Sequence, residues 1–251
     1  MDTIRVAHLS KAYTSTTTEI VVDNAHRQTR TRQVLRDLTV EFPIGKLTAI
    51  VGRSGCGKST LLKILDKQEQ ADSGEIRMPE GWHTSLLSPN PYVITWTNVV
   101  RNVAMAAGAG RTPEERMELA QKLVRLVRLE DYADLTPNEL STGMKQRLGL
   151  ARVLASRAEV LLMDEPFASL DFITRQELQQ EVLAIQAQMP RTIILVTHQL
   201  EEALLMAQRV VVMQADSGIQ VFDLSAYPYS RDLLSPELLA LREEITAACR
   251  K

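Results

Sequence analysis

The chain has 251 residues, of which 45% are hydrophobic and 24% are charged, a composition typical of a globular protein rather than a disordered one. Its formal net charge of −2 at pH 7 offers no electrostatic basis for binding nucleic acid. No apolar run approaches the roughly 18 residues that a membrane-spanning helix needs, and the first residues lack the apolar stretch of a signal peptide. The two cysteines do not form a disulfide framework. We therefore expect a cytosolic protein that serves a membrane, if at all, from its surface.

The N-terminal part predicts two strands of an antiparallel sheet. Apolar and polar residues alternate over residues 3–9 and again over residues 34–42. The segment 14–32 between them is polar and rich in Thr and Arg, and we interpret it as a long hairpin connection with some strand character at residues 19–22. Its basic residues favour a solvent-exposed face, with a partner contact as the alternative, and they are Arg27, Arg30 and Arg32.

Residues 47–60 carry the strongest motif of the chain. The apolar run Leu47–Val51 predicts a buried strand, and Lys58–Leu65 predicts a helix. The glycine-rich loop between them fits the pattern G-x-x-x-x-G-K-[ST], which binds a nucleoside triphosphate. The residues of this phosphate loop are Gly52, Arg53, Ser54, Gly55, Cys56, Gly57, Lys58, Ser59 and Thr60.

The order of strand, loop and helix is what the chemistry of phosphate binding requires. The glycines let backbone N–H groups turn toward the phosphates, and the helix N-terminus adds positive potential. Lys58 is expected to reach the β- and γ-phosphates, and the Ser59 hydroxyl is expected to hold Mg²⁺. Cys56 stands beside them at the helix N-terminus, so we expect its thiol to be alkylated in the nucleotide-free protein and protected by ATP.

The next segment predicts short strands followed by a block of helices. Strands are expected at residues 76–78 and 84–87, and a proline-containing cluster after them marks a boundary. Beyond it, residues 114–128 carry apolar side chains at helical spacing, and Thr112-Pro113-Glu114-Glu115 is a start signal for that helix. Ser141 is a suitable N-cap for a further helix. We therefore expect residues 89–155 to form an inserted helical subdomain.

The C-terminal half predicts a parallel sheet, because its apolar runs are continuous and indicate strands covered on both faces. These strands are expected at residues 160–164, 192–197 and 210–213. The helices are expected at residues 174–188, 200–207 and 235–251. We expect a single α/β domain over residues 1–251, with a catalytic core formed by residues 1–88 and 156–225 and a C-terminal helical tail over residues 226–251.

Polar side chains follow two of these strands. Asp164 and Glu165 come at the end of the strand 160–164, and His198 follows the strand 192–197. The carboxyl ends of parallel strands open onto the ligand crevice of an α/β sheet, so we expect these three residues beside the phosphate loop. In phosphate-loop enzymes one carboxylate binds the Mg²⁺ that bridges the phosphates, and a second can polarise the attacking water. These roles suit Asp164 and Glu165, respectively.

Four further motifs follow the phosphate loop in a fixed order. Residues 140–147 read LSTGMKQR, residues 161–166 read LLMDEP, residues 169–171 read SLD, and residues 196–198 read VTH. Together these motifs resemble the nucleotide-binding subunits of ATP-binding cassette (ABC) transporters over nearly the whole chain. The resemblance implies a RecA-like P-loop NTPase core with a mostly parallel sheet, an N-terminal antiparallel β part and the inserted helical subdomain.

The resemblance also implies roles for individual residues. Tyr13 would stack on the adenine of ATP, Glu165 would be the catalytic base, and His198 would be the switch histidine that acts with it. Asp171 would belong to the D-loop. The signature residues would face the γ-phosphate of an ATP held by an opposing subunit, and they are Ser141, Thr142, Gly143 and Met144.

Further details are similar to the branch that takes up nitrate, sulfonates and taurine. They are Cys56, Met144, Trp96 with Asn102-Val103, the segment Glu201–Leu204, and the closing Ser235-Pro236-Glu237 with Leu241-Arg242. This likeness implies a Mg²⁺-dependent ATPase that energises the uptake of a small anionic solute. The implied partners are a second ATPase subunit, identical or not, transmembrane permease subunits and a separate solute-binding protein. The implied location is the cytoplasmic face of the inner membrane.

The chain departs from the family's pattern in three places. Thr142 replaces a signature glycine, Asp66-Lys67 replaces the usual Ala-Gly, and Pro89 stands where the Q-loop glutamine belongs. In the family that glutamine touches Mg²⁺ and relays the nucleotide state to the membrane subunits. A proline has no side-chain oxygen, so Asn90 is the nearest candidate for the missing metal contact.

Two alternative functions remain open at this point. The chain could be a degenerate cassette that binds ATP, hydrolyses little of it and acts as a regulatory or heterodimer partner. It could also be a soluble ABC protein of DNA repair or of the ribosome. About 100 residues separate the phosphate loop from Asp164, which leaves no room for a repair-type coiled coil, and a single cassette is present rather than a tandem pair.

Overall fold

The computed structural model describes residues 2–21, 24–108, 110–168, 170–216, 218–227 and 231–250. Within these ranges the strands form a six-stranded sheet of order β5-β6-β7-β3-β8-β9 and a three-stranded sheet of order β2-β1-β4. The strands of the larger sheet are β3 (Leu47–Gly52), β5 (Thr84–Leu87), β6 (Val160–Asp164), β7 (Thr192–Val196), β8 (Arg209–Met213) and β9 (Ile219–Asp223). Those of the smaller sheet are β1 (Thr3–Val21), β2 (Asn24–Pro43) and β4 (Ser73–Arg77).

The larger sheet is parallel from β5 to β8, and β9 alone pairs antiparallel, with β8. The side chains of its central strands point alternately to two cores. In β3, for example, Ala49 belongs to one core and Ile50 to the other, and Leu161 and Leu162 of β6 divide in the same way. Each fully buried aliphatic side chain stabilises the fold by about 1.5–3 kcal/mol. The continuous apolar runs therefore mark strands covered on both faces, and the α/β class predicted from the sequence is confirmed.

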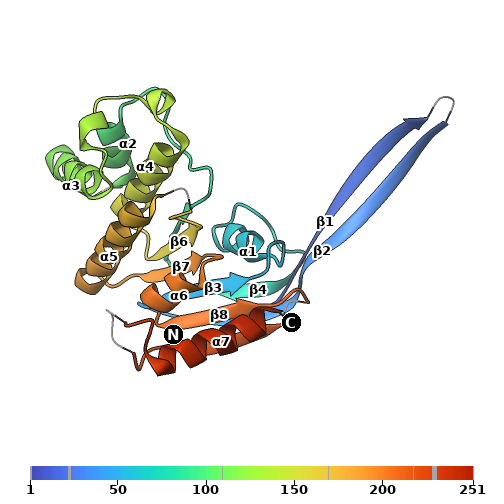
Figure 1. The fold of residues 1–251 in the computed structure, drawn as a ribbon. Helices are drawn as coiled ribbons and strands as arrows, with labels where there is room; N and C mark the ends of the chain where they lie inside the picture. Colours follow the sequence, from blue (N-terminus) through green and yellow to red (C-terminus); the bar gives the residue numbers. More distant parts are fainter. Residues whose placement is uncertain are drawn as a thin grey trace.

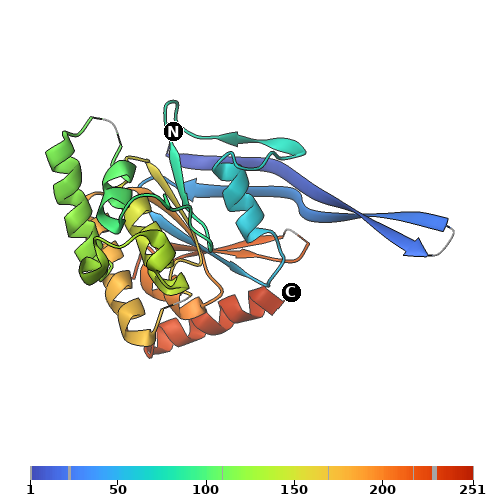
Figure 2. The ribbon, with the colours of Figure 1, turned by 90° about the horizontal axis from the view of Figure 1, so that it is seen from above.

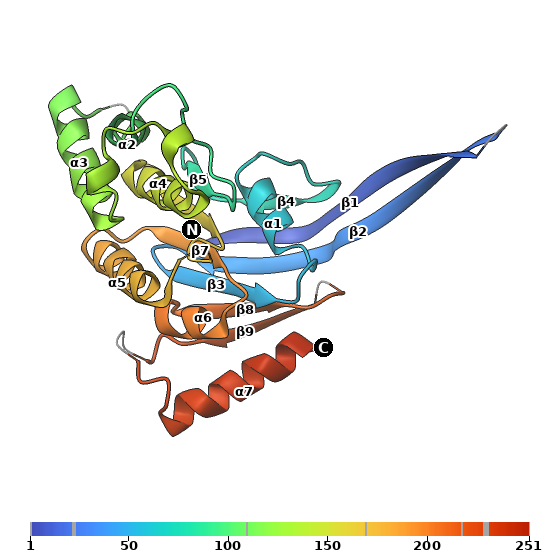
Figure 3. The same ribbon diagram turned by 45° about the horizontal axis from the view of Figure 1, so that its top comes forward.

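Different elements cover the two faces of this sheet. The helix α1 (Lys58–Leu65) and the smaller sheet share one core, in which Leu61 packs with Ile4 and Phe42. The helices on the opposite face include α5 (Phe172–Gln188), α6 (Leu200–Met206) and α7 (Pro236–Arg250). Figure 3 shows α1 and α7 on opposite sides of the sheet, with α7 running along β8 and β9.

The helices α2 (Val99–Ala106), α3 (Pro113–Leu126) and α4 (Thr142–Ala155) gather at one end of the molecule (Figure 1). Short 3₁₀ turns at Glu130–Tyr132 and Pro137–Glu139 join the last two of them. A capping box begins α3, because Thr112 Oγ accepts from the backbone N–H of Glu115 and the Glu115 carboxylate accepts from that of Thr112. Ser141 caps α4 by accepting from the Met144 N–H at 3.3 Å, so both predicted helix starts are confirmed.

The segment 14–32 is paired strand rather than the long hairpin connection that was expected. The strands β1 and β2 continue through it in unbroken antiparallel register, from the pair Thr14 and Thr31 to the pair Val21 and Asn24. This paired ribbon projects far beyond the rest of the protein (Figures 1 and 2). Its polar composition favoured a loop in the sequence interpretation, but threonine is also a good strand former. Val22, which was expected to be strand, lies outside the described residues.

Smaller differences concern element ends and one additional strand. The helix α5 begins two residues before the expected Thr174, at Phe172, because Asp171 accepts from the Thr174 N–H and caps it. The strand β9 was not expected, since its residues are mostly exposed and carry no strong alternation. In the part of the chain that the structure describes, no helix is both long and apolar enough to cross a membrane.

Candidate functional site

The phosphate loop connects the buried strand β3 to α1, and its glycines are required by its geometry. Gly52 has a φ of 154°, and a Cβ atom there would lie 2.2 Å from the carbonyl oxygen of Met213. Gly57 has a φ of 103°, and a Cβ atom there would lie 2.5 Å from Leu35. Side chains at either position would therefore clash or strain the backbone. The loop can turn its N–H groups toward an anion at the N-terminus of α1.

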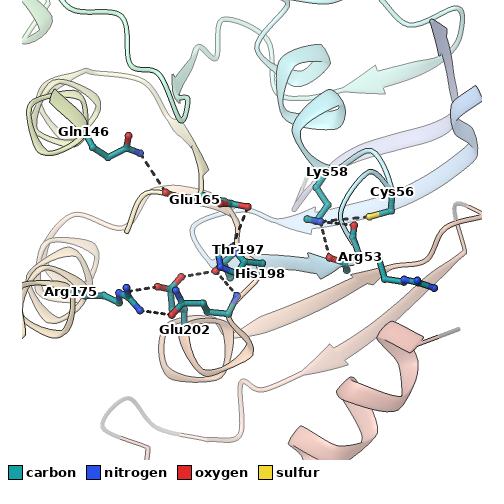
Figure 4. A network of polar contacts seen from close by, with 11 residues as sticks. Arg53, Cys56, Lys58, Gln146, Glu165, Arg175, Thr197, His198 and Glu202 are labelled. Carbon is teal, nitrogen blue, oxygen red and sulfur yellow. Dashed lines mark hydrogen bonds and ion pairs between the residues drawn. The ribbon is translucent and has the colours of Figure 1, made fainter. Parts of the chain in front are cut away.

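Lys58 lies inside this loop and is 8% exposed. Its ammonium group donates to the backbone carbonyls of Gly52 and Arg53, at 2.8 and 3.0 Å (Figure 4). The two carbonyls compensate the cost of burying the charge. Phosphate oxygens are stronger acceptors for an ammonium group, so a bound triphosphate can compete for these donors.

Cys56 is buried, which contradicts the expectation of an accessible, reactive thiol. The residue is 4% exposed and packs in the core beneath α1, with its Sγ 3.8 Å from Lys58 Nζ. An alkylating reagent cannot reach a sulfur in this position without opening the loop. The motif places Cys56 beside the phosphates in sequence, but it does not say which side chains of the loop point inward.

Asp164 and Ser59 form a pair that fits a magnesium ion. Asp164 ends β6 and is 5% exposed, and burial raises the pKa of its carboxyl group, while a hydrogen bond from Ser59 opposes that rise. Among the described residues, Asp164 Oδ1 has no hydrogen-bond partner. A buried carboxylate oxygen left without a partner, next to a hydroxyl, is the type of hard oxygen donor set that Mg²⁺ prefers.

Glu165 and His198 face each other at the ends of β6 and β7. Their side chains approach to 3.3 Å, between His198 Nδ1 and Glu165 Oε1, and both are accessible to solvent (Figure 4). Glu165 has a φ of 51°, which is uncommon for a residue other than glycine. Its backbone is held on both sides, since its N–H donates to Val196 O at 2.9 Å and its carbonyl accepts from the Gln146 side chain at 3.4 Å.

A cavity of about 720 Å³ joins these parts. Its lining comes from the base of the ribbon, the phosphate loop and the ends of β6 and β7. The sequence-predicted residues that line it are Tyr13, Gly52, Ser54, Gly55, Gly57, Lys58, Ser59, Thr60, Glu165 and His198. Tyr13 is 39% exposed, which leaves its ring available for stacking. Of the described loop residues, Arg53 and Cys56 do not line the cavity, and neither does the more deeply buried Asp164.

Arg32 and Val34 also line this cavity, and the sequence interpretation missed them. Arg32 stands opposite Tyr13 in the register of β1 and β2, and its guanidinium donates to Gly55 O at 3.4 Å. Arg32 is exposed, as expected for a solvated face, and its side chain also reaches the phosphate loop, which was not expected. The signal that could have identified it is the strand register, which requires the ribbon to be recognised as paired.

The other sequence-predicted site residues lie elsewhere. Ser141 and Thr142 are exposed at the start of α4, Gly143 and Met144 follow them in its first turn, and Asp171 caps α5. Thr142 has no positive φ, so its position does not require the glycine that it replaces. Pro89 and Asn90 are exposed in the segment after β5. None of these described residues lines the cavity.

Comparisons with known proteins agree with this geometry. The family model of ABC transporters matches residues 35–168. The aliphatic sulfonates import ATP-binding protein SsuB 1 of Shouchella clausii is 35% identical over 224 residues, which are 89% of this chain and 88% of that protein. The taurine import ATP-binding protein TauB of Rhizobium johnstonii is 35% identical over 240 residues, which are 89% of this chain and 91% of that protein.

Among solved structures, the dimeric ATP-binding cassette MJ0796 bound to ADP and Pi has a similar fold. Its TM-score is 0.73 at 22% sequence identity, over 88% of this chain and 98% of that one. The fold agrees with the sequence matches, and the sequence matches show that the chain belongs to the ABC transporter family, as an ATP-binding subunit in the branch that includes the sulfonate and taurine import proteins.

Proposed function

We propose that this protein binds and hydrolyses ATP to drive the uptake of a small anionic solute of the nitrate, sulfonate or taurine class through separate membrane subunits. The observation that carries the proposal is one cavity in which the phosphate loop faces Glu165 and His198. The names of the relatives, which are import ATP-binding proteins for sulfonates and taurine, support the direction of transport and the class of solute.

The residues of the cavity suggest how ATP is held. The adenine stacks on Tyr13, and the phosphates take hydrogen bonds from the loop N–H groups and from Lys58 in place of the carbonyls that it now contacts. Ser59 and Asp164 would hold Mg²⁺, which would supply positive charge beside the β- and γ-phosphates. Burial raises the pKa of the Asp164 carboxyl group, and the Ser59 hydroxyl opposes that rise, which supports their pairing around one cation.

Hydrolysis is assigned to Glu165, the carboxylate that is exposed to the cavity. Glu165 accepts a proton from the attacking water. His198, whose Nδ1 lies 3.3 Å from Glu165 Oε1, orients the Glu165 carboxylate. The positive φ of Glu165 and the contact from Gln146 to its carbonyl hold its side chain at the cavity. Asp164 cannot serve as the base in this arrangement, because it is buried beside Ser59.

A second ATPase subunit completes the site in this proposal. Ser141 and Gly143 begin α4, whose N-terminus carries the positive end of the helix dipole and suits a γ-phosphate from the other subunit. Asp171 of the D-loop lies at the same kind of exposed helix start. We also infer the division into a core of residues 1–88 and 156–225, a helical subdomain of residues 89–155 and a tail of residues 226–251.

The membrane subunits have a candidate docking surface beyond β5. A groove of about 270 Å³ lies between this strand and α4, and Tyr92 at its edge is 89% exposed. Trp96, four residues further along the chain, is 83% exposed. Large aromatic residues exposed to this degree commonly mark protein interaction sites. The proposed location is therefore peripheral, at the cytoplasmic face of the inner membrane, with permease subunits and a separate solute-binding protein as partners.

Purification from membranes tests the proposal as a whole. The tagged protein should co-purify with integral membrane subunits, and the complex should hydrolyse ATP faster when the solute and its binding protein are present. The variant Tyr92→Ala/Trp96→Ala should lose the membrane subunits while it retains ATP binding. A protein that hydrolyses ATP but never associates with membrane subunits would contradict the proposed transport function.

A further inference from the structure

A buried network of polar side chains lies behind Glu165 and His198, outside the cavity. It joins Arg175 of α5 to Glu202 of α6, with 3.9 Å between Arg175 Nε and Glu202 Oε1 (Figure 4). The Glu202 side chain is 5% exposed and that of Arg175 is 22% exposed. Taking such charges out of water is costly, so a buried pair of this kind calls for a specific reason.

Glu202 holds the chain on which His198 is placed. Its Oε2 accepts from the Thr197 hydroxyl at 2.6 Å, and that hydroxyl in turn accepts from the backbone N–H of Gln199 at 3.0 Å. The residues on both sides of His198 are therefore fixed by one carboxylate. Burial raises the pKa of the Glu202 carboxyl, while Thr197 and Arg175 favour its charged form.

Arg175 connects this carboxylate to the loop between β6 and α5. Its guanidinium donates to Leu170 O at 2.9 Å and to the side-chain oxygen of Gln199 at 2.7 Å. Leu170 directly precedes Asp171, which caps the N-terminus of α5. One side chain thus contacts both the segment that follows β6 and the segment that carries His198.

The pair is only partly engaged in this conformation. Glu202 Oε1 and Arg175 Nε have no hydrogen-bond partner among the residues that the structure describes. A relative shift of about 1 Å between α5 and α6 would bring them to hydrogen-bonding distance. A purely structural ion pair would be expected to use these atoms, because a buried hydrogen-bonding atom without a partner is unfavourable.

We propose that Arg175 and Glu202 are positioning residues that tie the segment around Asp171 to His198, and so set His198 against Glu165. The proposal rests on the assignment of Glu165 and His198 to ATP hydrolysis. Neither Arg175 nor Glu202 is among the described residues that line the nucleotide cavity. Their loss should therefore slow the chemical step and leave ATP binding intact.

The test compares the full-length protein with Arg175→Met, Glu202→Gln and the double variant. We expect kcat for ATP hydrolysis to fall about tenfold in each single variant, with KM and the equilibrium Kd for ATP unchanged. The double variant should be no slower than the slower single variant, because the two residues act through one contact. Amide hydrogen exchange of the peptide 197–203 should also be faster in Arg175→Met, without ATP.

Glu177→Gln is the matched control, because it weakens a different ion pair of α5, in which Glu177 lies 2.6 Å from Arg128 and both side chains are more than 40% exposed. Exposed pairs contribute little, so this variant should behave as the wild type. If Glu202→Gln does not fold, Arg175→Lys is used in its place. Lysine keeps the positive charge but cannot donate to two acceptors in the way the guanidinium does, so kcat should again fall at constant KM.

Three results would overturn the proposal. The first is an unchanged kcat in folded variants, and the second is an additive loss of activity in the double variant. The third is a variant in which kcat falls, KM rises and the melting temperature falls at the same time. A wild-type protein that binds ATP but does not hydrolyse it would instead refute the proposed function. The wild-type assay therefore separates failure of the proposed function from failure of the positioning role.

Discussion

The proposed function assigns ATP contacts to two surfaces, the nucleotide cavity and the start of α4. They differ in how many segments of the chain contribute residues to them. The cavity is assembled within one chain, from the ribbon, the phosphate loop and the ends of two strands. Ser141 and Thr142 lie exposed at the start of α4, which Figure 1 shows among the helices at one end of the molecule, whereas α1 lies nearer its middle. In the proposed function, one chain therefore holds ATP in its cavity, and the signature surface acts on the nucleotide of a second chain.

Glu165→Gln tests the chemical half of this comparison and should have the largest effect. The substitution keeps the shape of the side chain but removes the base, so hydrolysis should fall by at least about 100-fold while ATP still binds. The rate is measured as phosphate release and the binding by equilibrium dialysis. Glu181→Gln, an exposed position on α5, is the control. Near-normal turnover in Glu165→Gln would show that another residue is the base.

Lys58→Ala tests the binding half. The ammonium group already donates to two carbonyls and is placed to donate to phosphates, and a hydrogen bond to a charged group contributes about 1.5–3 kcal/mol. ATP affinity should therefore fall about ten- to a hundredfold in titration calorimetry. Lys63→Ala changes an exposed lysine of the same helix and should leave the affinity unchanged. Equal affinities in the two variants would contradict the placement of ATP in this loop.

Pro89→Gln should have a smaller effect. It tests the position at which the chain lacks the glutamine of the family's pattern. A glutamine restores the side-chain oxygen that the proline lacks, so basal hydrolysis should rise several-fold or become more dependent on the membrane subunits. Asn90→Ala should lower the rate if Asn90 supplies the missing contact. Unchanged rates in both variants would show that the metal contact and the relay use other residues.

Arg32→Ala should have the smallest effect. Its guanidinium is exposed and reaches the phosphate loop over a 3.4 Å contact, so ATP affinity should fall only about two- to fivefold at low ionic strength. The difference should shrink at high salt, because exposed charges are screened. Arg36→Ala, on the same strand, is a control for the loss of one positive charge. A loss that does not depend on salt would argue against an electrostatic contact.

The sequence was sufficient where function and burial depend on local pattern. The phosphate loop, the carboxylates at the end of β6 and His198 after β7 each follow a continuous apolar run, so parallel-sheet geometry brings them to one edge. The helix starts at Thr112 and Ser141 were equally readable, because capping uses residues close in sequence.

The remaining features depend on contacts between distant residues. The contact of Arg32 with Gly55 requires the register of a ribbon whose polar residues resemble a loop. The inward direction of Cys56 is set by packing against α1. The network of Arg175 and Glu202 joins residues of two helices and cannot be recognised from either helix alone.

The molar mass of Glu165→Gln with and without Mg-ATP, measured by light scattering, shows whether α4 of one chain meets the nucleotide of another. We expect a monomer without nucleotide and a dimer with it, because hydrolysis no longer releases the two chains. Adding Ser141→Arg, which places a bulky side chain at the exposed start of α4, should keep the protein monomeric although ATP still binds. A dimer that forms without ATP, or that Ser141→Arg leaves intact, would contradict the claim that α4 completes the site of a second chain.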